Sequence, residues 1–595
     1  MKDKKIQIYK MRSNILLGVF VFILVLIIAR FFYLQIIQGS KLKELREQNI
    51  NAFEYIYPKR GRILSRDGVV LAEDRKVFSL VIDIEQKPSE KSINKLGDLY
   101  PNKINVEDLK LKVGNSIKFR RSEVVIERLS QEDLAKYLVG GSDITGFSVI
   151  EGYERQYNSH PSIFHVLGHM GYINNSDVKY FSPRIEDYNP KIWNKVGKSG
   201  IERVYEQLLQ GEHGKRFFQR NARGDRRVIT DISPFREGEE LSISINFNAQ
   251  KLAYELMQKR RGAIVVIDLQ DFSIPVAIST PSISANDLRD ISSLQYQDLL
   301  NDSARPLFNR AFMGLYPPAS TIKPLLTIFA LNNKYTDWEE TIFDDGFFRF
   351  EEEKRVFNAW REGGHGLTDL NKALVESSNP FFMNLSVRYE KDLFVQFLKS
   401  SSFGSKLCED CYPHQFSPLI DDDWKYKNFG KELFKGDFIN LGVGQGYMLT
   451  TPLHLSLISA ILAKRGEYQL PHLVAKKQNK LSLSDNLTEE DWDKLNMSLI
   501  DVIYSPNGTG YRINAGDLKL AGKSGTAQVV DINSREEYDE VRTNQLLRDH
   551  AIFIGYAPYD NPRYSIAVIV ENGESGGRVA GPIAKTVLKE LLNDF

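Results

Sequence analysis

A serine and a lysine three residues apart, Ser320 and Lys323, form the pattern with the clearest chemical meaning in the sequence. A serine hydroxyl is a weak nucleophile and needs a neighbouring base to take its proton. Residues at this spacing share one face of a helix, so Lys323 can be that base if burial or nearby cations lower its pKa. The pair therefore suggests acyl transfer through a covalent serine intermediate.

The same spacing occurs at least three more times, so the sequence around each copy must distinguish them. The other copies begin at Ser40, Ser92 and Ser176. Only Ser320 follows a pair of prolines and precedes a long apolar segment. Prolines suit the start of a helix, where backbone N–H groups have no helical partner, and the positive helix end favours negative charge developing near Ser320.

A second polar pattern, Ser377-Ser378-Asn379, follows an apolar helical segment and precedes Pro380-Phe381-Phe382. Its hydroxyl and amide groups could hold both the lysine and a substrate, and an ordinary capped helix end is the alternative interpretation. A similar triplet, Ser484-Asp485-Asn486, lies in a polar stretch and is predicted to be linker and helix cap.

The third pattern, Lys523-Ser524-Gly525-Thr526, is predicted to be a strand. Lys523 and the two hydroxyl groups could bind a carboxylate, and Gly525 could let a ligand backbone approach closely. The edge of such a strand can also pair with an extended peptide. An upstream copy, Lys198-Ser199-Gly200, leads into a predicted helix and is interpreted as a turn.

The elements that must position these motifs begin near residue 240, where the pattern of apolar residues changes. Predicted strands at both ends of the segment, with helices between them, indicate one α/β domain over 241–595 whose sheet uses both ends of the segment. Its predicted elements are strands at 241–245, 262–268, 273–279, 551–556 and 564–571, and helices at 248–259 and 582–592. The preceding region, 38–240, is expected to mix strands and short helices, including a strand at 78–84 and a helix at 201–209.

The N-terminus carries a basic segment, 1–12, followed by an apolar run that ends at residue 37. About 23 helical residues reach roughly 34 Å, which is enough to cross a bilayer. Basic residues before the span place the N-terminus in the cytoplasm and the remainder outside. A cleaved signal peptide is the alternative, but Ile36-Ile37-Gln38-Gly39-Ser40 is a poor cleavage site, so we expect a retained anchor at 13–37.

The composition limits the kinds of ligand and partner that we expect the protein to bind. The 595 residues have a formal net charge of +1, which gives no general attraction to nucleic acid. The two cysteines, Cys408 and Cys411, have C-x-x-C spacing, which outside the cytoplasm favours a disulfide or idle thiols over metal binding or redox catalysis.

The three motifs in this order resemble the active-site set of penicillin-binding proteins and class A β-lactamases. The chain most resembles a class B penicillin-binding protein, a D,D-transpeptidase, of the elongation type called penicillin-binding protein 2. The resemblance runs from the anchor to about Ala584. Further matching stretches are Arg60-Gly61-Arg62-Ile63, Arg66-Asp67-Gly68, His165 to Gly171, Gly197 to Gly214, Asn309-Arg310-Ala311, Gly444-Gln445-Gly446, Thr451-Pro452-Leu453 and His550 to Pro558.

The resemblance implies an α+β or α/β multidomain fold. It consists of one transmembrane helix, an elongated mixed pedestal at 38–240, and a transpeptidase domain with an antiparallel sheet, flanking helices and an all-helical subdomain. It also implies crosslinking of peptidoglycan stem peptides through a serine acyl-enzyme, covalent inhibition by β-lactams, and a weak D,D-carboxypeptidase side activity. No cofactor or nucleic acid is expected.

Site residues carry over from the family motif by motif. The implied catalytic residues are Ser320, Lys323, Ser377, Asn379 and Lys523. Substrate binding falls to Ser524, Gly525 and Thr526, and the oxyanion hole to the backbone N–H groups of Ser320 and Thr526. The implied partners are a polytopic inner-membrane glycan polymerase and other elongation-complex proteins, with the catalytic domain in the periplasm.

The sequence departs from its relatives at several positions. Pro318 stands where they usually have glycine, and Ser65 and Asn246 each replace an aspartate. Some relatives have a metal site of two aspartates, a histidine and a cysteine near the second motif. Here His365 and either Asp344 or Asp345 could match, but Ala359 and Ser378 fill the other positions, so no metal is predicted.

Three other functions remain open at this level. A septal transpeptidase would share the chemistry, a β-lactamase would hydrolyse its acyl-enzyme, and a scaffold would only activate a glycan polymerase. The pedestal stretches and Gly444-Gln445-Gly446 favour the elongation type. The anchor and pedestal argue against a β-lactamase, and the intact motifs argue against a pure scaffold.

Overall fold

The computed structural model describes residues 2–38, 51–83, 86–119, 122–184, 195–220, 226–233, 235–350, 355–483, 486–530 and 542–593. Two compact units share the chain, and each takes its residues from several segments. Unit 1 comprises Met1–Lys59, Arg75–Glu154 and Gln210–Gly238, and unit 2 comprises Arg60–Asp74, Arg155–Leu209 and Glu239–Phe595. Two segments of the predicted pedestal are therefore packed with the C-terminal domain.

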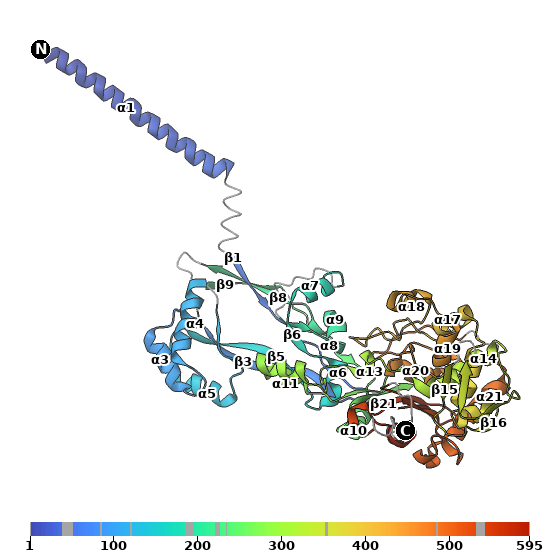
Figure 1. The fold of residues 1–595 in the computed structure, drawn as a ribbon. Coiled ribbons are helices and arrows are strands. Elements are labelled where there is room, and N and C mark those ends of the chain that lie inside the picture. Colours follow the sequence, from blue (N-terminus) through green and yellow to red (C-terminus); the bar gives the residue numbers. More distant parts are fainter. Residues whose placement is uncertain are drawn as a thin grey trace. The chain divides into compact units, whose positions relative to one another are not determined.

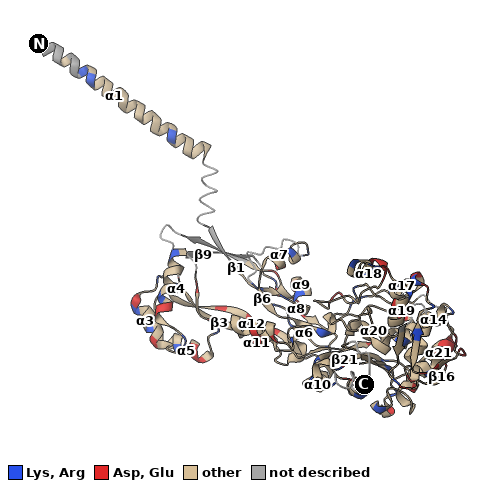
Figure 2. Ribbon diagram, in the orientation of Figure 1, with Lys and Arg blue, Asp and Glu red and all other residues tan. Residues whose placement is uncertain are grey.

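The N-terminal helix α1 (Lys2–Phe32) continues into a short π-helix at Tyr33–Ile37. The segment Lys10–Ile37, which includes the π-helix, is 28 residues long and contains a stretch of 18 residues with a mean hydropathy of 3.0, none of it buried. Figure 2 shows a helix that is almost free of charged residues beyond its first turns. Within the described residues it is the one helix long and apolar enough to cross a membrane, as the sequence predicted.

Unit 1 combines an antiparallel sheet with a helical cluster. Strand β8 lies between β1 and β9 in the sheet, and three amphipathic helices bury their apolar faces around Leu80 and Ile82 of a second sheet. Ser130 caps one of these helices: its Oγ accepts from the Asp133 N–H, and the Asp133 carboxylate accepts in return from the Ser130 N–H. The elements are β1 (Asn51–Ile56), β8 (Gly214–Arg220), β9 (Arg226–Ser233), β3 (Val70–Ile82), α3 (Glu90–Leu99), α4 (Val106–Phe119) and α5 (Gln131–Gly140).

A five-stranded antiparallel sheet organises unit 2, in the order β12-β11-β21-β20-β19. Two strands come from the start of the predicted domain and three from its end, which confirms the sheet built from both ends. The strands are β11 (Gly262–Asp268), β12 (Val276–Thr280), β19 (Ala521–Ala527), β20 (His550–Ala557) and β21 (Tyr564–Val570).

Both faces of this sheet are covered, so its inner strands β11 and β21 are apolar over most of their length. Alternate residues of β11 point to opposite sides, with Val265 packing in the core that contains α20 (Pro452–Ala463). Ile264 packs instead with α10 (Phe247–Met257) and α23 (Gly581–Asn593). The sheet is thus a rigid middle layer between helices.

Further helices of unit 2 gather beyond the sheet (Figure 1). Phe329 of α14 lies at the centre of an aromatic cluster that also contains Tyr389, Phe394 and Phe397. These helices are α14 (Lys323–Asn332), α15 (Leu370–Val375), α16 (Asn379–Ser386), α17 (Lys391–Ser400), α19 (Lys435–Leu441) and α21 (Glu489–Tyr504). The multidomain fold with flanking helices and a helical subdomain is confirmed.

Some local predictions differ from the structure. The expected strand at 241–245 is regular only at β10 (Leu241–Ser242), which pairs in parallel with β2 (Ile63–Leu64). The expected helix at 201–209 is interrupted at Tyr205, giving two short helices, α8 (Gly200–Val204) and α9 (Glu206–Gln210). The local spacing of apolar residues carries no information about pairing between strands that are far apart in the sequence.

The cysteine pair, whose state the sequence left open, forms a disulfide between Cys408 and Cys411. Both cysteines are buried. The bridged loop contacts an upstream segment of unit 2, because Gly200 donates its backbone N–H to the Tyr412 carbonyl at 2.8 Å. The disulfide therefore closes a loop that packs against the α8 segment.

A buried ion cluster joins two separate segments of unit 2. Arg60 contacts Glu202 and Glu206, each at 2.8 Å, and Arg155 Nε donates to Glu202 at 2.6 Å. Burial alone would raise the pKa of Glu202, but Arg155 and Arg60 outweigh it, and the pKa is lowered. The cluster is therefore ionised, and its members depend on one another.

Replacing Glu202 with alanine is expected to destabilise unit 2 by about 3 kcal/mol or more, because two buried guanidinium groups lose their shared carboxylate. The thermal unfolding midpoint of the detergent-solubilised chain measures this. Asp560→Ala is the matched control, since Asp560 pairs with Lys519 at the exposed surface and should have no measurable effect. Equal midpoints for both variants would contradict the proposed role of the cluster.

Candidate active site

Ser320 and Lys323 lie at the junction of two helical turns. Ser320 belongs to a 3₁₀ turn at Ala319–Ile322, and Lys323 is the first residue of α14. Ser320 is partly exposed, whereas Lys323 has no exposed surface. The predicted helix start is therefore a tight turn that presents the hydroxyl and directs the lysine into the interior.

The backbone before Ser320 is strained, and a contact with a distant segment of unit 2 holds it in this conformation. Ala319 has a φ of 50°, a region that non-glycine residues rarely occupy. Its N–H donates to the Gly444 carbonyl at 2.8 Å. A Cβ atom on Gly444 would lie 2.2 Å from the Ala319 carbonyl oxygen, so only glycine fits there. Pro318 has an ordinary φ of −67°.

The second motif surrounds the lysine amine. Lys323 Nζ lies 3.0 Å from the Ser377 carbonyl, 3.2 Å from the Ser378 carbonyl and 2.8 Å from Asn379 Oδ1. Ser377 Oγ lies at 3.4 Å. Residues more than 50 positions apart in the sequence thus meet at one nitrogen.

The environment of Lys323 favours a neutral amine. Burial lowers its pKa well below the ordinary lysine value, and the neighbouring charge of Lys523 lowers it further. The carboxylate of Asp344 acts in the opposite direction and does not reverse the shift. A neutral amine within reach of a serine hydroxyl can accept its proton, and the hydroxyl that the structure places 3.4 Å from this amine is that of Ser377.

Ser377 and Ser378 adopt the conformation that the contact with Lys323 needs. Ser377 has a φ of 62°, and Trp360 Nε1 donates to its carbonyl at 3.3 Å. Ser378 Oγ accepts from the Phe381 N–H and caps α16. The triplet is therefore both a helix cap and a neighbour of Lys323, so the two interpretations of the sequence are compatible.

The third motif lies on β19, an edge strand of the sheet. Burial lowers the pKa of Lys523 to about 7. Ser524 Oγ donates to Thr509 Oγ1 at 2.8 Å, and the Thr526 carbonyl accepts from Gln445 Nε2 at 3.4 Å. Thr526 is exposed, so the strand meets solvent there.

The structure requires a glycine at position 525 for a different reason from the one that the sequence suggested. A Cβ atom there would lie 2.9 Å from Thr321 Cγ2 and 3.2 Å from the Pro318 carbonyl. The close approach is therefore made by the turn that carries Ser320. This contact brings the first and third motifs together.

The structure also adds residues that the sequence did not indicate. Trp360 and Thr509 contact the second and third motifs through single hydrogen bonds. Thr509 follows Asn507-Gly508, a turn signal that could have drawn attention to it. Trp360 has no such signal. Ser484 and Asp485 of the rejected triplet lie outside the described residues.

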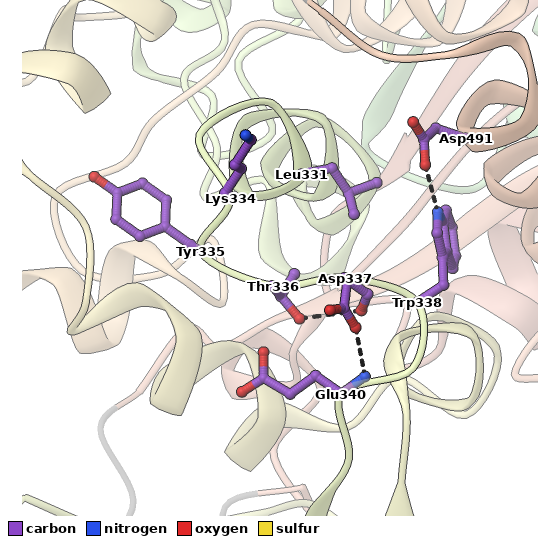
Figure 3. A pocket seen from close by; sticks show the side chains of 8 residues that line it. All are labelled: Leu331, Lys334, Tyr335, Thr336, Asp337, Trp338, Glu340 and Asp491. Carbon is purple, nitrogen blue, oxygen red and sulfur yellow. Dashed lines mark hydrogen bonds between the residues drawn. The ribbon is translucent and has the colours of Figure 1, made fainter.

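A cavity of about 390 Å³ opens at the other end of α14. Figure 3 shows Trp338 pointing toward Asp491, to which its Nε1 donates at 2.9 Å. The cavity is lined by Leu331, Lys334, Tyr335, Thr336, Asp337, Trp338, Glu340 and Asp491. None of the three motifs reaches it, so we do not assign it to the active site.

Two family models match the chain. Residues 262–589 match the penicillin-binding protein transpeptidase domain, and residues 55–243 match the penicillin-binding protein dimerisation domain. The peptidoglycan D,D-transpeptidase MrdA of Haemophilus influenzae is 33% identical over 90% of this chain and 84% of that protein. MrdA of Acinetobacter baumannii is 31% identical over 98% of this chain and 88% of that protein.

Solved structures of penicillin-binding protein 2 are also similar to this chain over most of its length. A complex of penicillin-binding protein 2 with MreC from Helicobacter pylori has a TM-score of 0.78 at 27% identity, covering 92% of this chain and 99% of that one. Penicillin-binding protein 2 of Pseudomonas aeruginosa in complex with WCK 5153 has a TM-score of 0.67 at 27% identity, covering 91% and 97%.

Acylation by a carboxylate-bearing β-lactam is expected to depend on pH with two limbs. At low pH, Lys323 is protonated and cannot accept the serine proton. Above about pH 7, Lys523 loses the positive charge that would bind the carboxylate, so the second-order acylation rate constant falls again. Stopped-flow labelling with a fluorescent penicillin measures both limbs.

The variant Lys523→Arg separates the two groups. A guanidinium stays charged throughout this range, so the alkaline limb should disappear while the acid limb remains. An unchanged alkaline limb in Lys523→Arg would assign that limb to another group.

Proposed function

The chain belongs to the penicillin-binding protein transpeptidase family, and from this premise we propose how its own residues perform the reaction. It is a peptidoglycan D,D-transpeptidase of the elongation type, with a serine acyl-enzyme. The relatives named MrdA and the penicillin-binding protein 2 structures favour elongation over the septal alternative. The proposal concerns the roles of individual residues.

In the acylation half-reaction, neutral Lys323 accepts the proton of Ser320. The serine oxygen attacks the carbonyl carbon of the penultimate D-alanine and forms a tetrahedral oxyanion. The backbone N–H groups of Ser320 and Thr526 stabilise this oxyanion. Collapse breaks the peptide bond, and Ser377 relays a proton to the departing D-alanine amine.

In the second half-reaction, an amine from a neighbouring stem peptide attacks the acyl-enzyme. The new peptide bond is the crosslink, and Ser320 recovers its proton. Before that, during acylation, Lys523, Ser524 and Thr526 hold the carboxylate of the terminal D-alanine, which then leaves with it. In both half-reactions Gly525 keeps the strand close to the reactive turn, and Asn379 positions both Lys323 and the donor. Water in place of the amine would give a weak D,D-carboxypeptidase activity.

One observation carries this assignment more than any other. Lys323 Nζ lies within 3.2 Å of three oxygens of the second motif while its pKa is lowered by burial. A buried lysine that served only as structure would need a carboxylate partner to remain charged. Among the described residues, Lys323 makes no ion pair shorter than 4.0 Å.

We also propose the membrane arrangement and two partners. The anchor at 13–37 crosses the cytoplasmic membrane once with the N-terminus inside, since basic residues precede it. The parts of both compact units that follow the anchor in the sequence then lie in the periplasm. A relative was solved with MreC, which supports an elongation-complex partner here. A polytopic glycan polymerase is proposed as a further partner through the anchor and pedestal.

Ser320→Ala is expected to abolish covalent labelling by a fluorescent penicillin, because no other hydroxyl replaces the nucleophile. Labelled protein on a denaturing gel, with mass mapping of the modified peptide, measures the loss. Ser176→Ala is the control, because Ser176 has the same spacing to a lysine but lies in an exposed helix of the pedestal. Persistent labelling of Ser320→Ala would show that the nucleophile is assigned wrongly.

A protease added to spheroplasts tests the membrane arrangement. If the N-terminus is inside, proteolysis should degrade the chain beyond residue 38 and leave an N-terminal tag protected. Replacing 13–37 with an unrelated span of the same orientation should preserve penicillin labelling and weaken co-purification of the polymerase. A degraded N-terminal tag in intact spheroplasts would exclude the proposed orientation.

A further inference from the structure

Behind the second motif lies a buried group of three polar side chains, Asp344, His365 and Ser378, here called the Asp344 cluster. Ser378 Oγ lies 2.6 Å from Asp344 Oδ2, and His365 Nδ1 lies 2.6 Å from the same oxygen. The side chains of Asp344 and His365 have no exposed surface. One carboxylate oxygen therefore joins a histidine to the middle residue of the triplet around Lys323.

The protonation states in this cluster follow from the contacts. Burial raises the pKa of Asp344, but the bonds from Ser378, His365 and the Gly346 N–H outweigh it, and the pKa is lowered. An ionised carboxylate can only accept hydrogen bonds, so Ser378 Oγ–H and His365 Nδ1–H must both donate. The proton on His365 Nδ1 is thus required by the geometry.

Backbone pairing fixes the position of the cluster. Asp344 ends β13 (Ile342–Asp344), which pairs with β16 (Gly366–Thr368), and the His365 N–H donates to the Asp344 carbonyl at 3.1 Å. Trp360 packs edge-on against the His365 ring at 5.7 Å and also bonds to Ser377. A small rigid element therefore supports the strained triplet from behind.

The cluster does not have the donors of a metal site. A structural zinc ion takes four ligands from cysteine, histidine and carboxylate groups. Ala359 supplies no donor, although its N–H bonds to the Gly346 carbonyl beside Asp344. Ser378 offers a hydroxyl in place of a thiolate. Within the described residues, no group of three His, Cys, Asp or Glu side chains could hold a metal ion.

We propose that the Asp344 cluster is a metal-free support that positions Ser377 and Asn379 around Lys323. Asp344 and His365 are positioning residues, because their hydrogen bonds reach the second motif through Ser378, and Asp344 in addition carries the charge that limits the shift of the Lys323 pKa. Hydrogen bonds alone hold the cluster together and join it to the second motif. This inference rests on the proposed role of Lys323 as the base.

Two substitutions of His365 test the proposal against metal binding. The amide nitrogen of asparagine can replace Nδ1, whereas that of glutamine reaches the position of Nε2. Nε2 is buried and has no hydrogen-bond partner among the described residues, so only Nδ1 should matter. His365→Asn should keep most of the acylation rate, and His365→Gln should lose about 10-fold or more.

The measurement separates binding from chemistry. Stopped-flow acylation by a fluorescent penicillin gives the rate constant of the chemical step and the dissociation constant of the initial complex. A positioning role predicts that His365→Gln lowers the rate constant and leaves the dissociation constant unchanged, with comparable unfolding midpoints for both variants. Asp344→Asn should behave like His365→Gln, while Asp345→Asn, at the exposed neighbouring position, should match the parent.

Metal content gives an independent readout. Elemental analysis of the full chain, purified without chelator, should find far less than one zinc ion per chain, and a chelator should change neither the unfolding midpoint nor acylation. One bound zinc ion, or equal losses in both His365 variants, would overturn the proposal, as would parental rates in both. Failure of Ser320→Ala to abolish labelling would instead reject the proposed function, so the two failures are distinguishable.

Discussion

The amine of Lys323 is fully buried, and burying a charged ammonium group costs free energy. The contacts that the second motif makes with Lys323 follow from this burial. An ammonium group in such a place loses its hydration, which favours the neutral amine. Three oxygens of the second motif lie within 3.2 Å of the nitrogen, of which a neutral amine can donate to two at a time, and Asp344 adds a nearby negative charge that limits the shift of the pKa. The result is an amine whose pKa lies well below the ordinary lysine value, as a base in this position would need, and whose place is fixed by its neighbours.

Holding the lysine in this way requires backbone conformations that a free peptide would avoid. Ala319, directly before Ser320, and Ser377, 54 residues after Lys323, both have positive φ. Each is fixed by contacts from elsewhere: Gly444 holds Ala319, and Trp360 with the capped helix α16 holds Ser377. Strain of this kind persists only where the surrounding fold over-determines the geometry. The layered sheet and its helices supply that rigidity.

Local patterns were enough to predict the apolar anchor, the strands of the main sheet and the three motifs, because each depends on spacing or on a continuous run of one residue type. They were not enough for the 3₁₀ turn at Ser320, which depends on the contact between Ala319 and Gly444. The sequence suggested that Gly525 leaves room for a ligand backbone. A Cβ atom at this position would instead come closest to Thr321 and Pro318. Trp360 and Thr509 were missed because one hydrogen bond between distant segments leaves no periodic signal.

The position of the third motif at the edge of the sheet links the fold to the kind of substrate. An edge strand presents unpaired backbone groups, which is a liability unless something covers them or uses them. Here β19 pairs with β20 on one side, and the reactive turn packs against Gly525. An extended peptide added to the free edge would run past Ser320, with Lys523 near its carboxylate end. Peptide specificity would then come largely from backbone pairing, which tolerates varied side chains, while the positive charge of Lys523 would select a free terminal carboxylate.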